Sequence, residues 1–316
     1  MGPFSVTAPL TRWRAHLPAA VAGSRQERRR QAVVHGLVLS GLLFGGYLFL
    51  VVTPSVRTFG FDAMSWWAID LAHLYSGATP EGPGLGSFRY APVIGQLLDP
   101  LGALPFWQFL WLYSTVLLGT ALWLGGRRRW LAALAFPPVA LELYHGNIHL
   151  LMAAAITLGF RYPAAWAFVL LTKVTPGVGL VWFAVRREYR SLAIVAGATA
   201  IVSAVSLATT PGLWLEWVGS LLATLPRSTT SGALIHVPIF VRLPAAALLV
   251  AWGARSDRHW TVPVAATIAM PVLWATSLAV LTAVIPLTDA SRRAELRPAG
   301  VRARGLGAAV AARSPE

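Results

Sequence analysis

The stretch Phe59–Tyr75 carries the residues of this chain whose types and spacing best suit chemistry. Read as one helix, it places four side chains on one face: Asp62, Trp66, Ile69 and His73. The stretch follows a long apolar segment directly, and a carboxylate just beyond a membrane span is costly unless it is solvated, paired or used. Two interpretations follow. One is an interfacial helix with a solvated acidic start and a tryptophan belt, and the other is a carboxylate base, Asp62, facing a site at the membrane surface.

The composition predicts the kind of molecule that must position these residues. Of 316 residues, 56% are hydrophobic and 12% are charged, about half the charged fraction of a soluble domain. The apolar runs are long and continuous instead of alternating, which disfavours a β-barrel. We therefore expect an all-α, polytopic membrane protein. The sequence has no cysteine and no His-Glu-x-x-His pattern, so we expect no metal and no cofactor.

The net charge of +14 comes from arginines at span ends and in both tails. This is the positive-inside pattern of membrane proteins. We interpret it as topology and attraction to membrane lipids with anionic head groups, not as nucleic-acid binding.

The apolar runs and arginine positions predict about ten membrane helices, including short broken ones. Residues 1–31 form a basic cytoplasmic tail, and the first span covers Val33–Val52. The integral membrane domain covers 32–287, with an outer loop over 53–105. Residues 288–316 form a second basic cytoplasmic tail, and both polar tails are expected to be disordered. The protein is expected in the plasma membrane, with both termini cytoplasmic and its site on the outer face.

Two long apolar segments are expected to turn back within the membrane. Arg161 and Arg186 are both cytoplasmic signals, yet only about two dozen residues separate them. A break at Lys173–Gly177 solves this conflict. The alternative is a single tilted span with a snorkelling lysine. The same argument predicts a second break near Pro271–Trp274, ahead of the basic tail.

Three shorter features complete the outer face. Ile94–Leu98 lies between two prolines and is too short to span, so we expect it at the surface. The sequence His145-Gly146-Asn147 is expected to make an outer turn. Pro211–Leu225 is expected to be a surface helix.

This topology gathers candidate functional residues at one face of the membrane. They are Asp62, Asp70, Arg89, Tyr90, His145, Asn147, Lys173, Arg227 and Trp274. A carboxylate base among cations suits the transfer of a group from a lipid phosphate to a hydroxyl. Asp62 would take the proton of the acceptor, and lysine and arginine would hold the phosphate. The sequence has no Gly-rich nucleotide loop, so a soluble nucleotide donor is not favoured.

The order of these motifs resembles glycosyltransferase family 87 over about residues 55–285. The motifs are Asp62, Tyr75-Ser76-Gly77, Phe88-Arg89-Tyr90-Ala91-Pro92, His145-Gly146-Asn147, Lys173 with Pro176, and Pro271 with Trp274. The resemblance implies the GT-C fold and an inverting transfer of mannose, or a related sugar, from a polyprenyl-phosphate donor. The acceptor would be a glycolipid or another glycan. Asp62 matches the catalytic aspartate of the family, and Lys173 matches a lysine near the lipid phosphate.

The chain departs from the family pattern in two places and is short for the family. The family often has Tyr-Pro-Pro where this chain has Tyr90-Ala91-Pro92, and tends to carry a histidine where this chain has Ala275, Thr276 and Ser277. Two other functions stay open. A transporter or flippase of a lipid-linked sugar also uses broken helices with charged residues at depth, and a non-catalytic relative of the transferases would tolerate the missing histidine.

Overall fold

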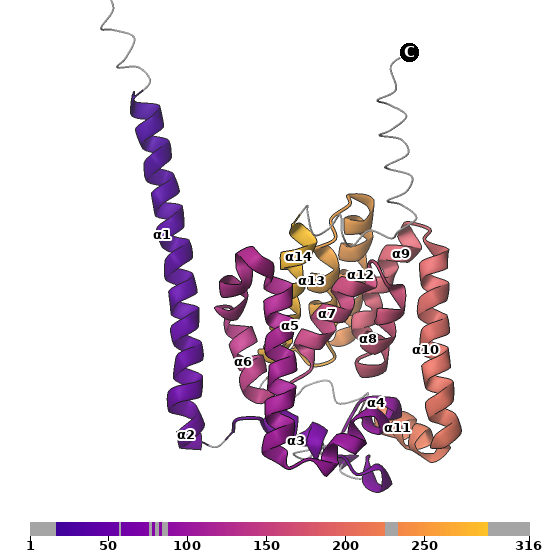
Figure 1. Cartoon of the computed structure of the whole chain (residues 1–316). Coiled ribbons are helices and arrows are strands. Elements are labelled where there is room, and N and C mark those ends of the chain that lie inside the picture. Colours follow the sequence, from indigo (N-terminus) through magenta and orange to yellow (C-terminus); the bar gives the residue numbers. More distant parts are fainter. Residues whose placement is uncertain are drawn as a thin grey trace, which may run out of the picture.

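The computed structural model shows a bundle of helices with one long helix standing beside it (Figure 1). The structure describes residues 17–56, 58–75, 78–79, 82–83, 88–224 and 233–289. Within these residues every regular element is helical except a two-residue antiparallel ladder of β1 (Ala78–Thr79) and β2 (Gly82–Pro83). The expected helical class is therefore confirmed.

The long helix is the first predicted span. α1 (Leu17–Tyr47) continues through a π-helical turn, η1 (Leu48–Val52), into α2 (Thr53–Val56), and Arg25–Val56 is long and apolar enough to cross a membrane. The expectation of a disordered N-terminal tail is wrong for residues 17–31, which are helical. Residues 25–31 are arginine, glutamine and glutamate, which are strong helix formers. A helix already nucleated in the apolar span can therefore extend into them.

α1 packs on the bundle through small residues. A Cβ added at Gly41 would lie 1.7 Å from the carbonyl oxygen of Ala135, and one added at Gly45 would lie 3.6 Å from Cβ of Ala140. Glycines four residues apart let two helices approach closely without a clash. Over residues 32–47, most of the other side chains are exposed and apolar, as expected of a surface in contact with lipid.

The segment that carries Asp62 is shorter than predicted. α3 (Phe61–Trp67) ends after two turns, so the prediction of one helix through Tyr75 is wrong. Asp70 starts a new element instead, because its carboxylate accepts a hydrogen bond from the backbone N–H of Ala72 and caps the 3-10 turn η2 (Leu71–His73). Ile69 and His73 therefore do not continue the helical face of Asp62.

α4 (Pro92–Leu98) and η3 (Asp99–Ala103) follow as short elements, as the bracketing prolines predicted. α3, α4 and α11 (Pro211–Thr224) lie at the lower end of the bundle in Figure 1. We call this end the loop end.

α5 (Phe106–Leu134) runs away from the loop end and is a second candidate span. Gly126, with φ of +61°, breaks it near the three arginines that were expected to end it. α6 (Pro137–His145) starts at the two prolines and returns toward the loop end. Gly146, with φ of +71°, then makes the predicted turn, and α7 (His149–Gly159) leaves at 117° to α6.

Both predicted breaks are confirmed. After η4 (Pro163–Ala165), α8 (Trp166–Thr172) ends at Lys173, whose backbone is extended, and the chain resumes as η5 (Thr175–Leu180) and α9 (Val181–Val185). α13 (Thr261–Ile268) is likewise separated from η6 (Thr276–Ala283) and α14 (Val284–Thr288).

A buried arginine holds the second break together. Arg242 lies in α12 (Ile239–Arg255) and is 7% exposed. Its guanidinium donates to the backbone carbonyl oxygens of Val237, Ile268, Met270 and Pro271. The carbonyls freed at the end of α13 thus find donors within the protein.

The predicted count of about ten membrane helices is not confirmed. In the described part of the chain, three helices are long and apolar enough to span: Arg25–Val56, α5 and α10 (Tyr189–Thr209). The bent α6–α7 pair makes a fourth if it is one span. The longest remaining helix, α12, has 17 residues, whereas a straight span needs about 20.

Candidate functional site

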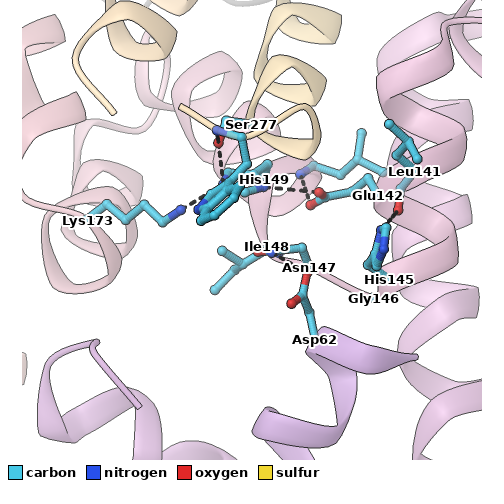
Figure 2. Close-up of polar contacts among 12 residues, drawn as sticks. Asp62, Leu141, Glu142, His145, Gly146, Asn147, Ile148, His149, Lys173 and Ser277 are labelled. Carbon is cyan, nitrogen blue, oxygen red and sulfur yellow. Dashed lines mark hydrogen bonds and ion pairs between the residues drawn. The ribbon is translucent and has the colours of Figure 1, made fainter. Parts of the chain in front are cut away.

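The candidate site lies where α3 meets the turn between α6 and α7. Asp62 is half-buried in the first turn of α3, and its Oδ2 accepts a hydrogen bond of 2.6 Å from Nδ2 of Asn147 (Figure 2). Oδ1 of Asn147 accepts a hydrogen bond of 2.7 Å from the backbone N–H of Ile148. Because a backbone N–H can only donate, this second bond fixes the amide with its NH₂ toward Asp62.

Aromatic residues connect α3 to this turn through hydrogen bonds and ring packing. The indole N–H of Trp66 donates to the carbonyl oxygen of Gly146, and the Trp66 ring packs on Tyr90 with centroids 4.6 Å apart. The hydroxyl of Tyr113 donates to the carbonyl oxygen of Asn147. A Cβ at Gly146 would lie 2.6 Å from Cβ of Ala63, so glycine is required for this approach as well as for its backbone conformation.

Burial raises the pKa of the Asp62 carboxyl, and the hydrogen bond from Asn147 opposes that shift. A negative charge on the nearby Glu142 raises the pKa of Asp62 further. A carboxylate with a raised pKa is a stronger base than an exposed one, which suits proton abstraction from a hydroxyl.

A second set of polar residues is a hydrogen-bonded series of three side chains, Glu142, His149 and Lys173. Nζ of Lys173 lies 2.7 Å from Nε2 of His149, and Nδ1 of the same ring lies 3.1 Å from Oε2 of Glu142. The other carboxylate oxygen of Glu142 accepts a hydrogen bond from the backbone N–H of Leu150. His149 and Glu142 are fully buried, whereas Lys173 is partly exposed. This hydrogen-bonded series thus runs from a fully buried carboxylate to a partly exposed lysine.

A residue beside the second helix break, Ser277, also contacts His149. Oγ of Ser277 lies 3.3 Å from Nε2 of His149 and accepts a hydrogen bond from the backbone N–H of Trp274. The indole of Trp274 itself is 38% exposed. Ser277 therefore occupies one of the positions where the resemblance led us to look for a histidine, and it faces a histidine from α7 instead.

Asp62 and Lys173 lie at the same end of the bundle. The backbone N–H of Ala91, just before α4, donates to the carbonyl oxygen of Leu171, which ties the end of α8 to the loop end. The charges of Asp62 and Arg89 both act on Lys173. Figure 2 shows Asp62 and Lys173 approaching the segment 147–149 from two sides.

Other predicted site residues take different positions. Asp70 is exposed and lies 2.8 Å from Nδ1 of His73, and this hydrogen bond lowers the pKa of Asp70. His145 contacts the carbonyl oxygen of Leu141 in its own helix. Arg89 is exposed, and its carbonyl oxygen accepts a hydrogen bond from Trp217. Arg227 lies outside the described residues.

Sequence reasoning missed Glu142 and His149. Two features of the sequence could have pointed to the hydrogen-bonded series Glu142–His149–Lys173. Glu142 is a carboxylate inside an apolar run, which marks a functional or paired group in a membrane protein. Lys173 is the only lysine among the 26 cationic residues of the sequence, and a lone ammonium in place of a guanidinium suggests a specific task.

The described residues hold no cluster of three or more histidine, cysteine, aspartate or glutamate side chains that could bind a metal ion. The fold and the site together define a helical protein with several apolar helices that could span a membrane. Comparisons with protein-family models, characterised proteins and solved structures give no match for this chain.

Proposed function

We propose that this protein is a GT-C-type membrane glycosyltransferase of the family 87 kind. It would move a sugar, with mannose as the first candidate, from a polyprenyl phosphate to a hydroxyl of a lipid-linked or polysaccharide acceptor. The observation that carries the proposal is that a half-buried carboxylate, Asp62, and a partly exposed lysine, Lys173, lie at the same end of a helical bundle.

In this reaction Asp62 takes the proton of the acceptor hydroxyl while its oxygen attacks the anomeric carbon of the donor. The bond between that carbon and the phosphate oxygen breaks, and the phosphate leaves with the electron pair. The Lys173 ammonium stabilises the charge that develops on the phosphate. Attack opposite to the leaving group inverts the anomeric centre.

The surroundings of Lys173 support a donor that stays in the membrane. Val174, the next residue, is 55% exposed, and the α8–η5 break leaves this part of the chain at the surface of the bundle. A phosphate carried on a polyprenyl chain could reach Lys173 from the lipid while its isoprenoid tail remains among lipid chains.

A transporter of a lipid-linked sugar is the second candidate, because two broken helices with charged or polar residues beside them also favour alternating access. The position of Asp62 in a short helix at the loop end favours the enzyme, because transporters hold their substrates near the midplane of the bilayer.

The direct test uses purified full-length protein in lipid nanodiscs. It is incubated with radiolabelled polyprenyl-phosphate mannose and a phospholipid mannoside, and elongated product is separated by chromatography. We expect product with wild-type protein, none with Asp62→Asn, and wild-type amounts with Asp99→Asn, which removes another carboxylate at the loop end. Absence of product with mannosyl, glucosyl and arabinosyl donors would reject the enzyme, and donor flux across proteoliposomes would then favour the transporter.

A further inference from the structure

The chain Glu142–His149–Lys173 has a defined hydrogen-bond direction. A lysine ammonium has three donors and no acceptor, so Nε2 of His149 must accept from Lys173. The proton of a neutral imidazole then lies on Nδ1, where it donates to Oε2 of Glu142. Glu142 thereby selects the tautomer that can receive the lysine.

The chain also balances charge in a place where charge is costly. Glu142 is the only fully buried carboxylate among the described residues, and when it is ionised its negative charge offsets the positive charge of Lys173. A buried charge that lacks a partner would be strongly destabilising. His149 lies between the two charged groups, so the amine is held by a hydrogen bond at a distance from the carboxylate instead of in a direct ion pair.

His149 leaves most of the ammonium free to bind something else. Within the described residues His149 is the hydrogen-bond partner found for Nζ of Lys173, and an ammonium has two further N–H donors. The Lys173 residue as a whole is partly exposed. These two donors are available to an anion at the loop end.

Ser277 gives His149 a second possible donor. Nε2 of an imidazole has one lone pair, and it lies 2.7 Å from Lys173 and 3.3 Å from the hydroxyl of Ser277. The shorter contact identifies lysine as the present donor. If the ammonium turns toward an anion, the Ser277 hydroxyl can donate to Nε2 instead, and the buried ring is not left unsatisfied.

We propose that Glu142 and His149 are positioning residues that aim the Lys173 ammonium at the phosphate of a polyprenyl phosphate, with Ser277 as the alternative donor to His149 when the lysine engages that phosphate. This inference rests on the proposed function and assigns roles to three residues, of which the sequence singled out only Ser277, as a position where the family tends to carry a histidine. None of the three is a catalytic residue, because each acts through Lys173 and not on the reacting atoms.

The lone lysine makes the inference measurable without activity. Full-length protein labelled with ¹⁵N at the lysine side chain has a single Nζ nucleus, so its NMR signal in nanodiscs reports Lys173 alone. The probe is farnesyl phosphate, a short polyprenyl phosphate without a sugar, and farnesol is its matched control without the phosphate. We expect farnesyl phosphate to move the signal and farnesol to leave it.

Four variants separate positioning from folding. His149→Leu removes both bonds of the ring and should shift the Nζ signal of the free protein. His149→Gln should restore it in large part, because its carbonyl oxygen can accept from Lys173 while its NH₂ donates to Glu142. Ser277→Ala should leave the free signal in place and weaken the response to farnesyl phosphate. Thr157→Val is the control, since Thr157 is fully buried in the same helix and its hydroxyl donates to the carbonyl oxygen of Ala153 in that helix.

Donor kinetics give the second readout. We expect His149→Leu to lower kcat/KM for the donor by about tenfold or more, the scale for a lost hydrogen bond to a charged group, with KM for the acceptor unchanged. Glu142→Gln should lower it as well, and melting temperature and gel filtration of each variant show whether it folds. If Glu142→Gln does not fold, the comparison of His149→Leu with His149→Gln still decides.

The two readouts fail separately. An Nζ signal that is the same in wild type, His149→Leu and Glu142→Gln overturns the positioning role even if sugar transfer is observed. A wild-type signal that ignores farnesyl phosphate overturns the aim at a phosphate. A signal that depends on His149 and responds to farnesyl phosphate supports the inference, and if no sugar transfer accompanies it, only the proposed enzyme activity is rejected.

Discussion

Asn147 couples the Asp62 carboxylate to the first turn of α7. Its Nδ2 donates to Oδ2 of Asp62 over 2.6 Å, and the other end of the same amide accepts from the backbone of Ile148. Because both ends of the amide are used, Asp62 meets a donor of fixed direction. This donor suits the ionised carboxylate and holds the Asp62 side chain in its half-buried position.

The first prediction is a shift in pH dependence when Asn147 is replaced. Burial raises the pKa of Asp62 and the Asn147 donor opposes that shift. A base must be ionised, so the rate falls as the pH drops through the pKa of Asp62. Asn147→Leu removes a donor that favours the ionised form, so the pKa should rise further and the acid limb should move to higher pH. The measurement is kcat/KM for the acceptor against pH.

Gln96→Leu is the matched control for this change. The Gln96 amide donates to Thr209 and Thr210 at the end of α10, and its loss leaves Asp62 untouched. An acid limb that stays in place, or moves to lower pH, in Asn147→Leu would argue against Asp62 as the base.

The second prediction concerns the side of the membrane from which Lys173 is reached. The sequence has no cysteine, so single cysteines can be placed freely. Lys173→Cys and Met64→Cys should react with an impermeant maleimide added outside, because both residues lie at the loop end. Asp257→Cys, beside Arg186, should react only after the membrane is opened. Labelling of residues 173 and 64 from opposite sides would contradict the fold, and labelling of both from inside would reverse the expected orientation.

The positions of arginines at both ends of each segment, together with proline and glycine residues, were sufficient to predict both helix breaks. The breaks at Lys173 and at Pro271–Trp274 were predicted because each apolar segment lies between arginine signals that both favour the cytoplasmic side, whereas a single span has its ends on opposite sides. The turn at Gly146 was predicted as well, because glycine favours the left-handed backbone found there.

The remainder depended on contacts that a sequence does not display. Residues 59–75 contain no proline or internal glycine beyond Gly60, so nothing local marks the end of α3 at Trp67, and only the capping bond of Asp70 reveals it. Glu142 and His149 face each other only because the chain folds back by 117° between their helices. Seven residues apart in one run, they gave no metal or catalytic spacing to recognise.

The third prediction tests how α1 is held. Gly41→Ala places a Cβ where the carbonyl of Ala135 lies, so α1 must move away from the bundle. Overpacking of this kind costs about 1–3 kcal/mol, and the melting temperature in detergent should fall. Gly36→Ala lies one and a half turns away in the same helix, with nothing within 4 Å of the new Cβ, and should leave the melting temperature unchanged or slightly raised. Equal effects of the two variants would show that α1 does not pack through Gly41.

The last prediction concerns the donor phosphate. Arg89 is exposed, lies just before α4, and its charge acts on Lys173. If both cations contact the phosphate, Lys173→Ala and Arg89→Ala should each weaken donor use more than acceptor use. Charge-assisted hydrogen bonds of this kind contribute about 1.5–3 kcal/mol each, which corresponds to roughly ten- to a hundredfold in kcat/KM for the donor.

The double variant should lose less than the product of the two single losses, because both side chains act on one phosphate. Arg258→Ala is the control. The Arg258 guanidinium lies over the ring of Trp252 in α12. The last turn of α12 also contains Ala254, whose carbonyl oxygen accepts a hydrogen bond from Arg186. Kinetics with varied donor at saturating acceptor decide the outcome. A donor response in Arg89→Ala equal to that of wild type would assign Arg89 to the membrane surface and leave Lys173, aimed by His149, as the phosphate contact.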